Sequence, residues 1–200
     1  SDVYKRQIDV RYMMKQNWKR TLQGTLLGAV LLAMAGCGST NVMDTYSFGH
    51  QVIRVGQSEV TIALPYEMGK STKNMTDDGY PIDIYGSVTE HMVIEVEALR
   101  AGDNKPLPTV DEFLNRSKSE FTKMGATIKE ESVALQGTSA KKLDVTYTTQ
   151  GQTFRFSQYV FLDHGVLWNI IYQYPEKDQV GADISKEIQN KIQVTQQKEG

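Results

Sequence analysis

The sequence FRFSQYVFLDHGVLWNIIYQY, residues 154–174, contains two apolar segments joined by a short polar turn. The turn residues Asp163-His164-Gly165 are types that tolerate the backbone conformations of tight hairpins. Residues 159–162 are all apolar or aromatic, so both faces of the first segment are apolar. A strand of this kind is typical of a sheet that is covered on both sides. The stretch therefore predicts an antiparallel hairpin in the middle of a covered β-sheet.

Several other segments alternate between apolar and polar residues, which predicts strands with one buried face. In one of them, Ile94 and Val96 belong to an apolar row, and Glu95 and Glu97 lie on the opposite face. The segments with this pattern are residues 60–64, 82–84, 92–98 and 143–147.

Two segments instead show the apolar spacing of a helix. Thr109-Val110-Asp111-Glu112 has the sequence of a capping box, so we expect a helix that begins after Thr109 and ends near Gly125. Near the C-terminus, isoleucines spaced four residues apart predict a closing helix, with Asp183 as its candidate N-cap. These isoleucines are Ile184, Ile188 and Ile192.

The order of these elements is several strands, one helix, a meander of strands and a final helix. It predicts an α+β fold in which an antiparallel β-sheet is flanked by two main helices, an α-β-α sandwich. Besides the last helix, the segments with the most characteristic texture are residues 109–113, 137–147, 154–161 and 167–170. In order and hydrophobic texture they resemble the PsbP/DcrB-like family, which includes small bacterial lipoproteins. The resemblance covers residues 46–194 and implies a PsbP-like sandwich with a non-catalytic role, such as assembly or protein binding.

The N-terminal region has the pattern of a signal peptide. Lys15, Lys19 and Arg20 form a basic flank, and residues 22–35 follow without a charge. A basic flank before a short apolar run is typical of secretory signals. A membrane-spanning helix needs about 20 apolar residues, so this run is short for a permanent span.

The only cysteine of the chain, Cys37, ends this run. Met34-Ala35-Gly36-Cys37 resembles the bacterial lipobox, with methionine where leucine is usual. The resemblance implies cleavage between Gly36 and Cys37 and a covalent lipid, a diacylglycerol thioether, on Cys37. Two or three acyl chains hold a domain stably on a bilayer. The alternatives are an uncleaved anchor helix and a small buried cysteine in the core.

These features divide the chain. Residues 1–13 are expected to be a non-native extension, so that the protein starts at Met14 or Met13. We expect a lipoprotein signal peptide over residues 14–36, a lipidated tether over 37–45, the α+β domain over 46–194 and a polar tail over 195–200.

Charge excludes one class of partner. Residues 1–36 carry six of the 22 basic side chains and two of the 24 acidic ones, which leaves residues 37–200 with a net charge of −6. Because nucleic-acid affinity depends on Lys and Arg that neutralise phosphates, we expect no nucleic-acid partner.

No catalytic constellation is evident, and we predict no catalytic residue, no metal site and no cofactor other than the lipid. The three histidines, His50, His91 and His164, lack partners at metal-ligand spacing. Residues 69–72 and 139–142 match only fragments of phosphate-binding and penicillin-recognising motifs. Proximity of His50 or His91 to Asp77 and Asp83 in the fold would instead favour an enzyme.

Aromatic side chains are concentrated on the last predicted hairpin. They pack in the core, or they form a recognition patch at a partly wet interface. The residues of this possible patch are Tyr159, Trp168, Tyr172 and Tyr174.

Together these features predict a non-catalytic, extracytoplasmic bacterial lipoprotein on the cell membrane or the outer membrane. We expect its domain to bind or assemble another envelope protein, and the oligomeric state stays open. The alternatives are an envelope hydrolase or metal-dependent enzyme, and a passive surface antigen.

Overall fold

The computed structural model describes residues 48–195. The predictions for the signal peptide, for Gly36 and Cys37 and for the tether up to residue 45 therefore lie outside the described residues. The elements, in chain order, are β1 (Gly49–Val55), β2 (Ser58–Leu64), β3 (Gly69–Lys70), β4 (Ile82–Val88), β5 (Val93–Arg100), α2 (Val110–Lys123), β6 (Thr127–Leu135), β7 (Thr138–Thr149), β8 (Gln152–Asp163), β9 (Val166–Pro175), α3 (Gln179–Ile188), the short 3-10 helix η2 (Gln189–Lys191) and β10 (Gln193–Val194).

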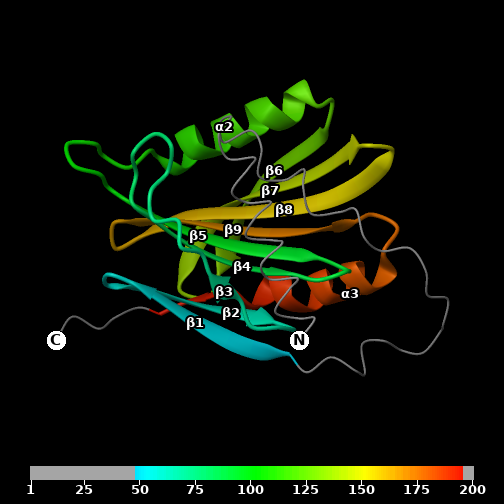
Figure 1. The fold of residues 1–200 in the computed structure, drawn as a ribbon, viewed down its shortest axis with the longest axis horizontal. Coiled ribbons are helices and arrows are strands. Elements are labelled where there is room, and N and C mark those ends of the chain that lie inside the picture. Colours follow the sequence, from blue (N-terminus) through cyan, green and yellow to red (C-terminus); the bar gives the residue numbers. More distant parts are fainter. Residues whose placement is uncertain (1–47, 196–200) are drawn as a thin grey trace. The chain divides into compact units, whose positions relative to one another are not determined.

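The strands within residues 48–195 form two antiparallel sheets (Figure 1). The larger sheet has seven strands in the order β3-β4-β5-β9-β8-β7-β6, and the smaller one has the order β1-β2-β10. The predicted hairpin is confirmed: β8 and β9 pair from Phe154↔Pro175 to Asp163↔Val166. Its turn residues His164 and Gly165 have positive φ angles of 44° and 73°. The hairpin also lies inside the large sheet, as its apolar faces predicted.

Each face of the large sheet carries a separate apolar layer. Helix α2 packs over β6, β7 and β8 on one face, where Phe121 meets Phe156 with ring centroids 4.8 Å apart. The small sheet and α3 pack on the other face, and the side chains of Ile62, Trp168 and Ile184 are fully buried between these elements. The hairpin is therefore covered on both sides, but by two different kinds of layer.

The prediction of an α-β-α sandwich with two main helices is wrong. Strands dominate residues 48–195, and the two α-helices there are short, with 14 and 10 residues. The β1–β2 hairpin does not extend the large sheet. It pairs with β10 and covers one face beside α3, because its buried side chains pack against β5 and β9. A second sheet thus takes much of the place predicted for a helix.

The helix signals were correct for α2 and partly correct for α3. The Thr109 hydroxyl accepts a hydrogen bond from the Glu112 backbone N–H, and the Glu112 carboxylate accepts one from the Thr109 backbone N–H, which completes the predicted capping box. The cap of α3 is Asp178 rather than Asp183, and Ile192 lies beyond the helix. Strand β6 was not predicted, because charged residues interrupt its apolar alternation. No helix found within residues 48–195 is long and apolar enough to span a bilayer.

Candidate functional site

Two buried glutamates on the central part of the large sheet form the most unusual polar feature of the described domain. Glu95 and Glu97 lie on β5, between β4 and β9, and each is only 8% exposed. Strand β5 alternates so that Ile94, Val96 and Ala98 face the core shared with the small sheet. The two carboxyl groups therefore share the opposite face of the sheet, the face on which α2 packs.

A chain of polar side chains continues from this pair across the sheet. Asn169 on β9 donates from its Nδ2 to Glu97 Oε2 at 2.7 Å. Gln158 on β8 donates from its Nε2 to Asn169 Oδ1 at 2.8 Å, and the same nitrogen lies 3.3 Å from Ser117 Oγ on α2. The amides thus hold the Glu97 carboxylate in one orientation and connect it to the helix.

Burial raises the pKa of both glutamates. The pKa of Glu95 rises from 4.5 to about 8, first because burial penalises the charged form, then because of the Glu97 charge and a hydrogen bond to Glu97. Burial also raises the pKa of Glu97, although hydrogen bonds from Asn169 and Glu95 and the charge of Lys73 oppose this effect. The pair therefore retains a proton to higher pH than an exposed carboxyl group does.

This arrangement can store a proton or exchange it for a cation. Two carboxyl groups in contact cannot both ionise easily, as carboxyl dyads in enzymes show. At 8% exposure the carboxyl oxygens have little surface to offer to a large substrate. The two carboxyl groups therefore act within the fold and not on the open surface.

In the sequence, alternation predicts that Glu95 and Glu97 lie opposite the apolar row of their strand, but it does not mark them as a site. A usable signal was present in the neighbouring strands. Gln158, Asn169 and Gln173 are amides within the two strands whose faces are otherwise largely apolar. Buried polar residues need hydrogen-bonding partners, so amides in such strands point to a polar cluster inside the fold.

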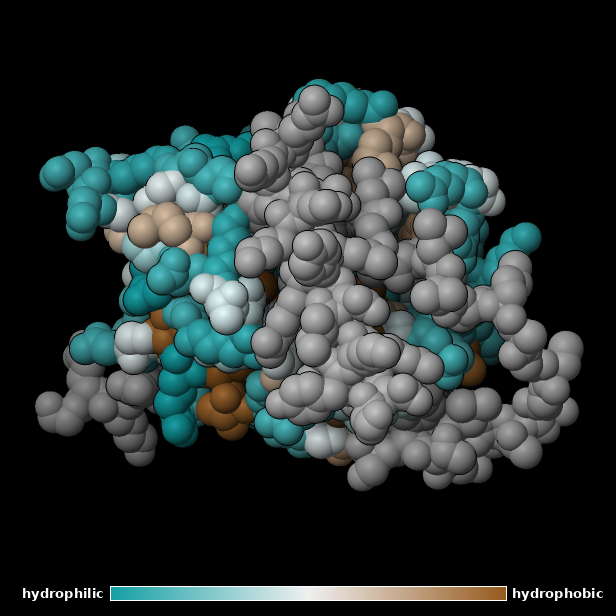
Figure 2. Space-filling view, in the orientation of Figure 1, coloured by the Kyte–Doolittle hydropathy of each residue, from teal (hydrophilic) through white to brown (hydrophobic). Residues whose placement is uncertain are grey.

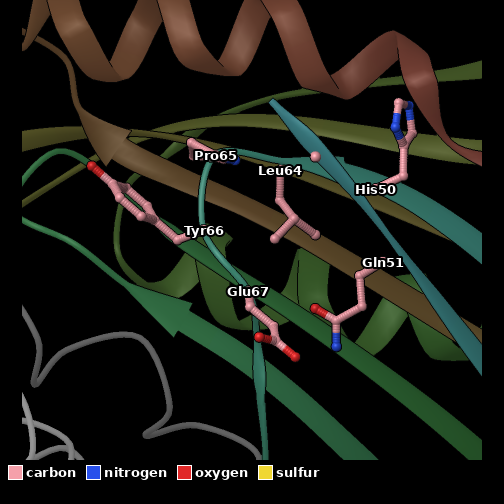
Figure 3. Close-up of a pocket in the computed structure, with 7 residues that line it drawn as sticks. His50, Gln51, Leu64, Pro65, Tyr66 and Glu67 are labelled. Carbon is pink, nitrogen blue, oxygen red and sulfur yellow. The ribbon is translucent and has the colours of Figure 1, made fainter. Parts of the chain in front are cut away.

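A separate pocket of about 290 Å³ lies beside the first hairpin. It is formed by the start of β1, the end of β2 and the residues that follow β2, and Figure 3 shows Tyr66 and His50 pointing away from one another in it. The Gln51 amide fixes one wall, since it accepts from the Met68 backbone at 2.8 Å and donates to the Met68 carbonyl at 3.2 Å. The lining residues are Gly49, His50, Gln51, Leu64, Pro65, Tyr66 and Glu67, and most of them are exposed.

The histidines and aspartates that would favour an enzyme do not come together. His91 Nδ1 contacts Asp178 at 2.9 Å, whereas Asp83 pairs with Lys70 and Arg100, and Asp77 with Lys73. His164 contacts its neighbour Asp163. Within residues 48–195, no group of three or more His, Cys, Asp and Glu side chains is arranged to hold a metal ion.

Comparison with known proteins gives no family for this chain. No protein-family model matches it, so the PsbP/DcrB-like resemblance has no such match, and no curated protein matches it either. One similar solved structure is that of LpqN, which is involved in cell envelope biogenesis of Mycobacterium tuberculosis. It is 13% identical with a TM-score of 0.39, and the match covers 78% of this chain and 96% of the LpqN chain. Another is PA94 from Pseudomonas aeruginosa, a protein of unknown function, which is 12% identical with a TM-score of 0.38. That match covers 69% of this chain and 91% of the PA94 chain. Similarity this low carries no functional argument. Any proposal about function therefore rests on the residues of this chain.

The aromatic side chains of the last hairpin are mostly core residues. Trp168 and Tyr172 are fully buried, Tyr159 is 3% exposed, and only Tyr174 is half-buried. Trp168 stacks on Phe161 and donates from its Nε1 to Ser58 Oγ at 2.8 Å, which ties β9 to β2. Burial removes three of the four rings from the surface, so they join the two layers instead of presenting a recognition patch.

Where described residues are visible in Figure 2, they form no broad apolar area. The described residues visible on this face are mainly hydrophilic, and the hydrophobic colour occurs in small separate areas. Exposed apolar side chains that are scattered singly are normal for a folded domain. The large ones in the described region are Val52, Tyr66, Met75, Met124 and Leu162.

Proposed function

We propose that this protein is an extracytoplasmic bacterial lipoprotein whose β-rich domain acts as a non-catalytic binding or assembly module of the cell envelope. The observation that carries the proposal is the position of the single cysteine, directly after a basic flank and a short uncharged apolar run. The PsbP/DcrB-like family remains a hypothesis that rests on the order of elements in the sequence.

The position of the folded domain is compatible with such an anchor. The described domain begins at Phe48, so ten residues separate it from Cys37. Ten residues reach at most about 35 Å at full extension. A domain held this closely would meet partners that lie at or near the same bilayer. The net charge of −6 for residues 37–200 favours contact with protein or a cation over contact with anionic lipid headgroups.

The anchor is tested by labelling cells of a bacterial host with radioactive palmitate. We expect the label in the wild type and in Ser39→Ala, which keeps the four residues of the lipobox, but not in Cys37→Ala. Intact mass should also show cleavage before Cys37. An unlabelled wild type of full length would contradict the anchor.

The binding role is tested separately, by crosslinking membranes of the native host and recovering the protein. We expect an envelope protein to be crosslinked to the wild type and lost with Cys37→Ala, because release from the bilayer removes the high local concentration. Recovery of the lipidated protein without any crosslinked partner would contradict the binding role and leave the anchor intact.

A further inference from the structure

We propose that strand β1 is a docking edge for a second copy of this chain, so that two β1 strands pair antiparallel about Val52 and join two small sheets into one. The proposal goes beyond a general binding role, since it names the partner and the register of the contact. It does not depend on the lipid anchor, because it concerns only the described domain.

Strand β1 forms an outer edge of the small sheet (Figure 1). Within residues 48–195 it pairs with β2 alone, along its whole length. An edge strand presents backbone N–H and C=O groups without backbone partners, and such groups pair with another extended chain. The backbone therefore specifies the chemistry of the occupant, which is a strand rather than a small molecule or a lipid.

The phase of the ladder identifies which backbone groups are open. Only two residues separate Val55 from its partner Ser58, so this pair closes a hydrogen-bonded turn, and hydrogen-bonded pairs alternate along the strands from there. The next pair, Arg54 with Glu59, then lacks such bonds. In agreement, the Glu59 carbonyl points away from β1, since it accepts from the Thr195 N–H at 3.0 Å. The residues of β1 whose backbone groups face outward are His50, Val52 and Arg54.

These open groups are arranged symmetrically about Val52. A second β1 that runs antiparallel, with Val52 opposite Val52, places Arg54 opposite His50 at both ends. Every open N–H and C=O of the two strands then has a partner. The result is a two-fold contact between identical surfaces, which is the commonest kind in homo-oligomers.

The side chains on the outer face also suit this register. Val52 is a large apolar side chain at an edge and is 47% exposed. Directly opposite side chains on one face of a sheet are in contact, so pairing removes both valines from water. Arg54 already pairs with Glu59 of its own sheet, which offsets its charge beside His50 of the second copy. Strand β1 carries no carboxylate that could oppose another.

The other edges of the two described sheets are protected against such pairing. Strands β3 and β10 have two residues each, which is too short to pair with another chain in a stable way. Strand β6 is longer, but its middle residue is Glu131. A second β6 centred in the same way would set Glu131 opposite Glu131, and like charges directly opposite one another are destabilising. Strand β1 has an apolar residue at the corresponding place.

Cysteine crosslinking of the purified whole chain in mild detergent tests the contact. Every variant carries Cys37→Ser, so that Val52→Cys and Arg54→Cys each contain one thiol. Directly opposite hydrogen-bonded residues have Cα atoms about 5.5 Å apart, within the range of a disulfide. Two copies of residue 54 would instead lie about 14 Å apart along the strands. Arg54→Cys is therefore the matched control, exposed on the same strand.

We expect the covalent dimer to form at least about tenfold faster with Val52→Cys than with Arg54→Cys, because a disulfide needs its Cα atoms within about 7 Å. His50→Cys mixed with Arg54→Cys should also form a disulfide-linked dimer, since these positions oppose one another, whereas neither variant alone should do so.

A backbone variant separates strand pairing from chance contact. Val52→Pro removes an N–H that points away from β2, so it leaves the hairpin intact but blocks the edge. Val52→Thr keeps the N–H and the preference for a strand, and is the control. Added to the chain that carries both His50→Cys and Arg54→Cys, Val52→Pro should abolish the covalent dimer, and Val52→Thr should keep it.

Two results would overturn the proposal. One is slow or equal crosslinking of Val52→Cys and Arg54→Cys, the outcome of random collision between exposed thiols. The other is a dimer that persists with Val52→Pro. If Val52→Pro instead removes a crosslink to a different envelope protein, and no dimer forms, the edge belongs to a strand of that protein. All variants are checked for native circular dichroism and a cooperative melt, so that a loss of pairing is not a loss of fold.

Discussion

Glu95 differs from the exposed carboxyl groups of this domain because its neighbours keep it protonated near neutral pH. Burial removes the water that would stabilise its charged form, and the neighbouring charge of Glu97 on the same face of the sheet disfavours that form further. A protonated carboxyl group can also donate a hydrogen bond, and the Glu97 carboxylate can accept it. The proton is therefore part of the folded structure, because without it two negative charges would be buried side by side.

A pH dependence of stability follows at this residue. Between about pH 4.5 and about pH 8 an unfolded chain has released the Glu95 proton while the folded chain retains it. The folded state then binds more protons, so its free energy of unfolding decreases as the pH rises through this range and levels off above pH 8. Denaturant unfolding, measured at several pH values, should show this decrease.

Substitution separates Glu95 from other titrating groups. Glu95→Gln stays neutral at every pH, so the free energy of unfolding of this variant should decrease less with pH than that of the wild type. Glu67→Gln, which removes an exposed carboxylate, should follow the wild type. Parallel curves for Glu95→Gln and the wild type would show that Glu95 is ionised in the folded state.

Among the elements, α3 depends on a close backbone approach to the turn between β4 and β5. Gly181 lies in the first turn of the helix, and a Cβ there would lie 2.5 Å from the His91 carbonyl oxygen and 2.9 Å from Tyr174 Cβ. Asp178 caps the same turn through the Gly181 N–H at 3.0 Å and also contacts His91 at 2.9 Å. Helix α3 is thus fixed at its N-terminus from two sides.

We therefore expect Gly181→Ala to destabilise the fold by about 1–3 kcal/mol, the range of an overpacked core, although alanine normally favours a helix. Chemical denaturation measures the change. Gly86→Ala is the matched control, because its Cβ meets only one backbone oxygen at 3.6 Å, and its stability should stay near that of the wild type. Equal stability of both variants would show that α3 can shift away from the turn without cost.

Local sequence patterns predicted the strands and helices that are long enough to show a regular spacing of apolar residues. The capping box at Thr109 and the hairpin around Asp163 depend only on neighbours in the chain, and both were confirmed. The split into two sheets could not be predicted, because residues 60–64 alternate in the same way whether β2 joins a large sheet or covers it. The Glu95–Glu97 pair was missed for a related reason: alternation shows two faces, but only the assembled fold shows that both are buried.

At the scale of the molecule, the small sheet and the large sheet share one core. Ile62 on β2, Trp168 on β9 and Ile184 on α3 are all fully buried in the same cluster. A cluster made from both sheets and a helix couples their unfolding. The described domain should therefore unfold as one cooperative unit.

Ile62→Ala tests this coupling. The truncation should cost about 2–5 kcal/mol, as for other large-to-small changes in a core. Circular dichroism reports all strands. Fluorescence of a chain that starts at Cys37, in which Trp168 is the one tryptophan, reports the shared core. We expect both midpoints to shift by the same amount. A shift confined to one signal would mean that the small sheet unfolds by itself. The control is Val52→Ala, at an exposed position of β1, which should leave both midpoints near those of the wild type.

The strand order β1-β2-β10 has a consequence for how the chain is made. A ribosome completes the first hairpin at Leu64, but α3 and β10, which cover it and pair with it, begin only at Gln179 and Gln193. Most of the polypeptide must therefore emerge before this hairpin acquires its final neighbours. During that interval its apolar strands are open to chaperones and to wrong pairing. A nascent chain that terminates early, before Gln179, would keep this hairpin exposed and present it to quality-control proteases.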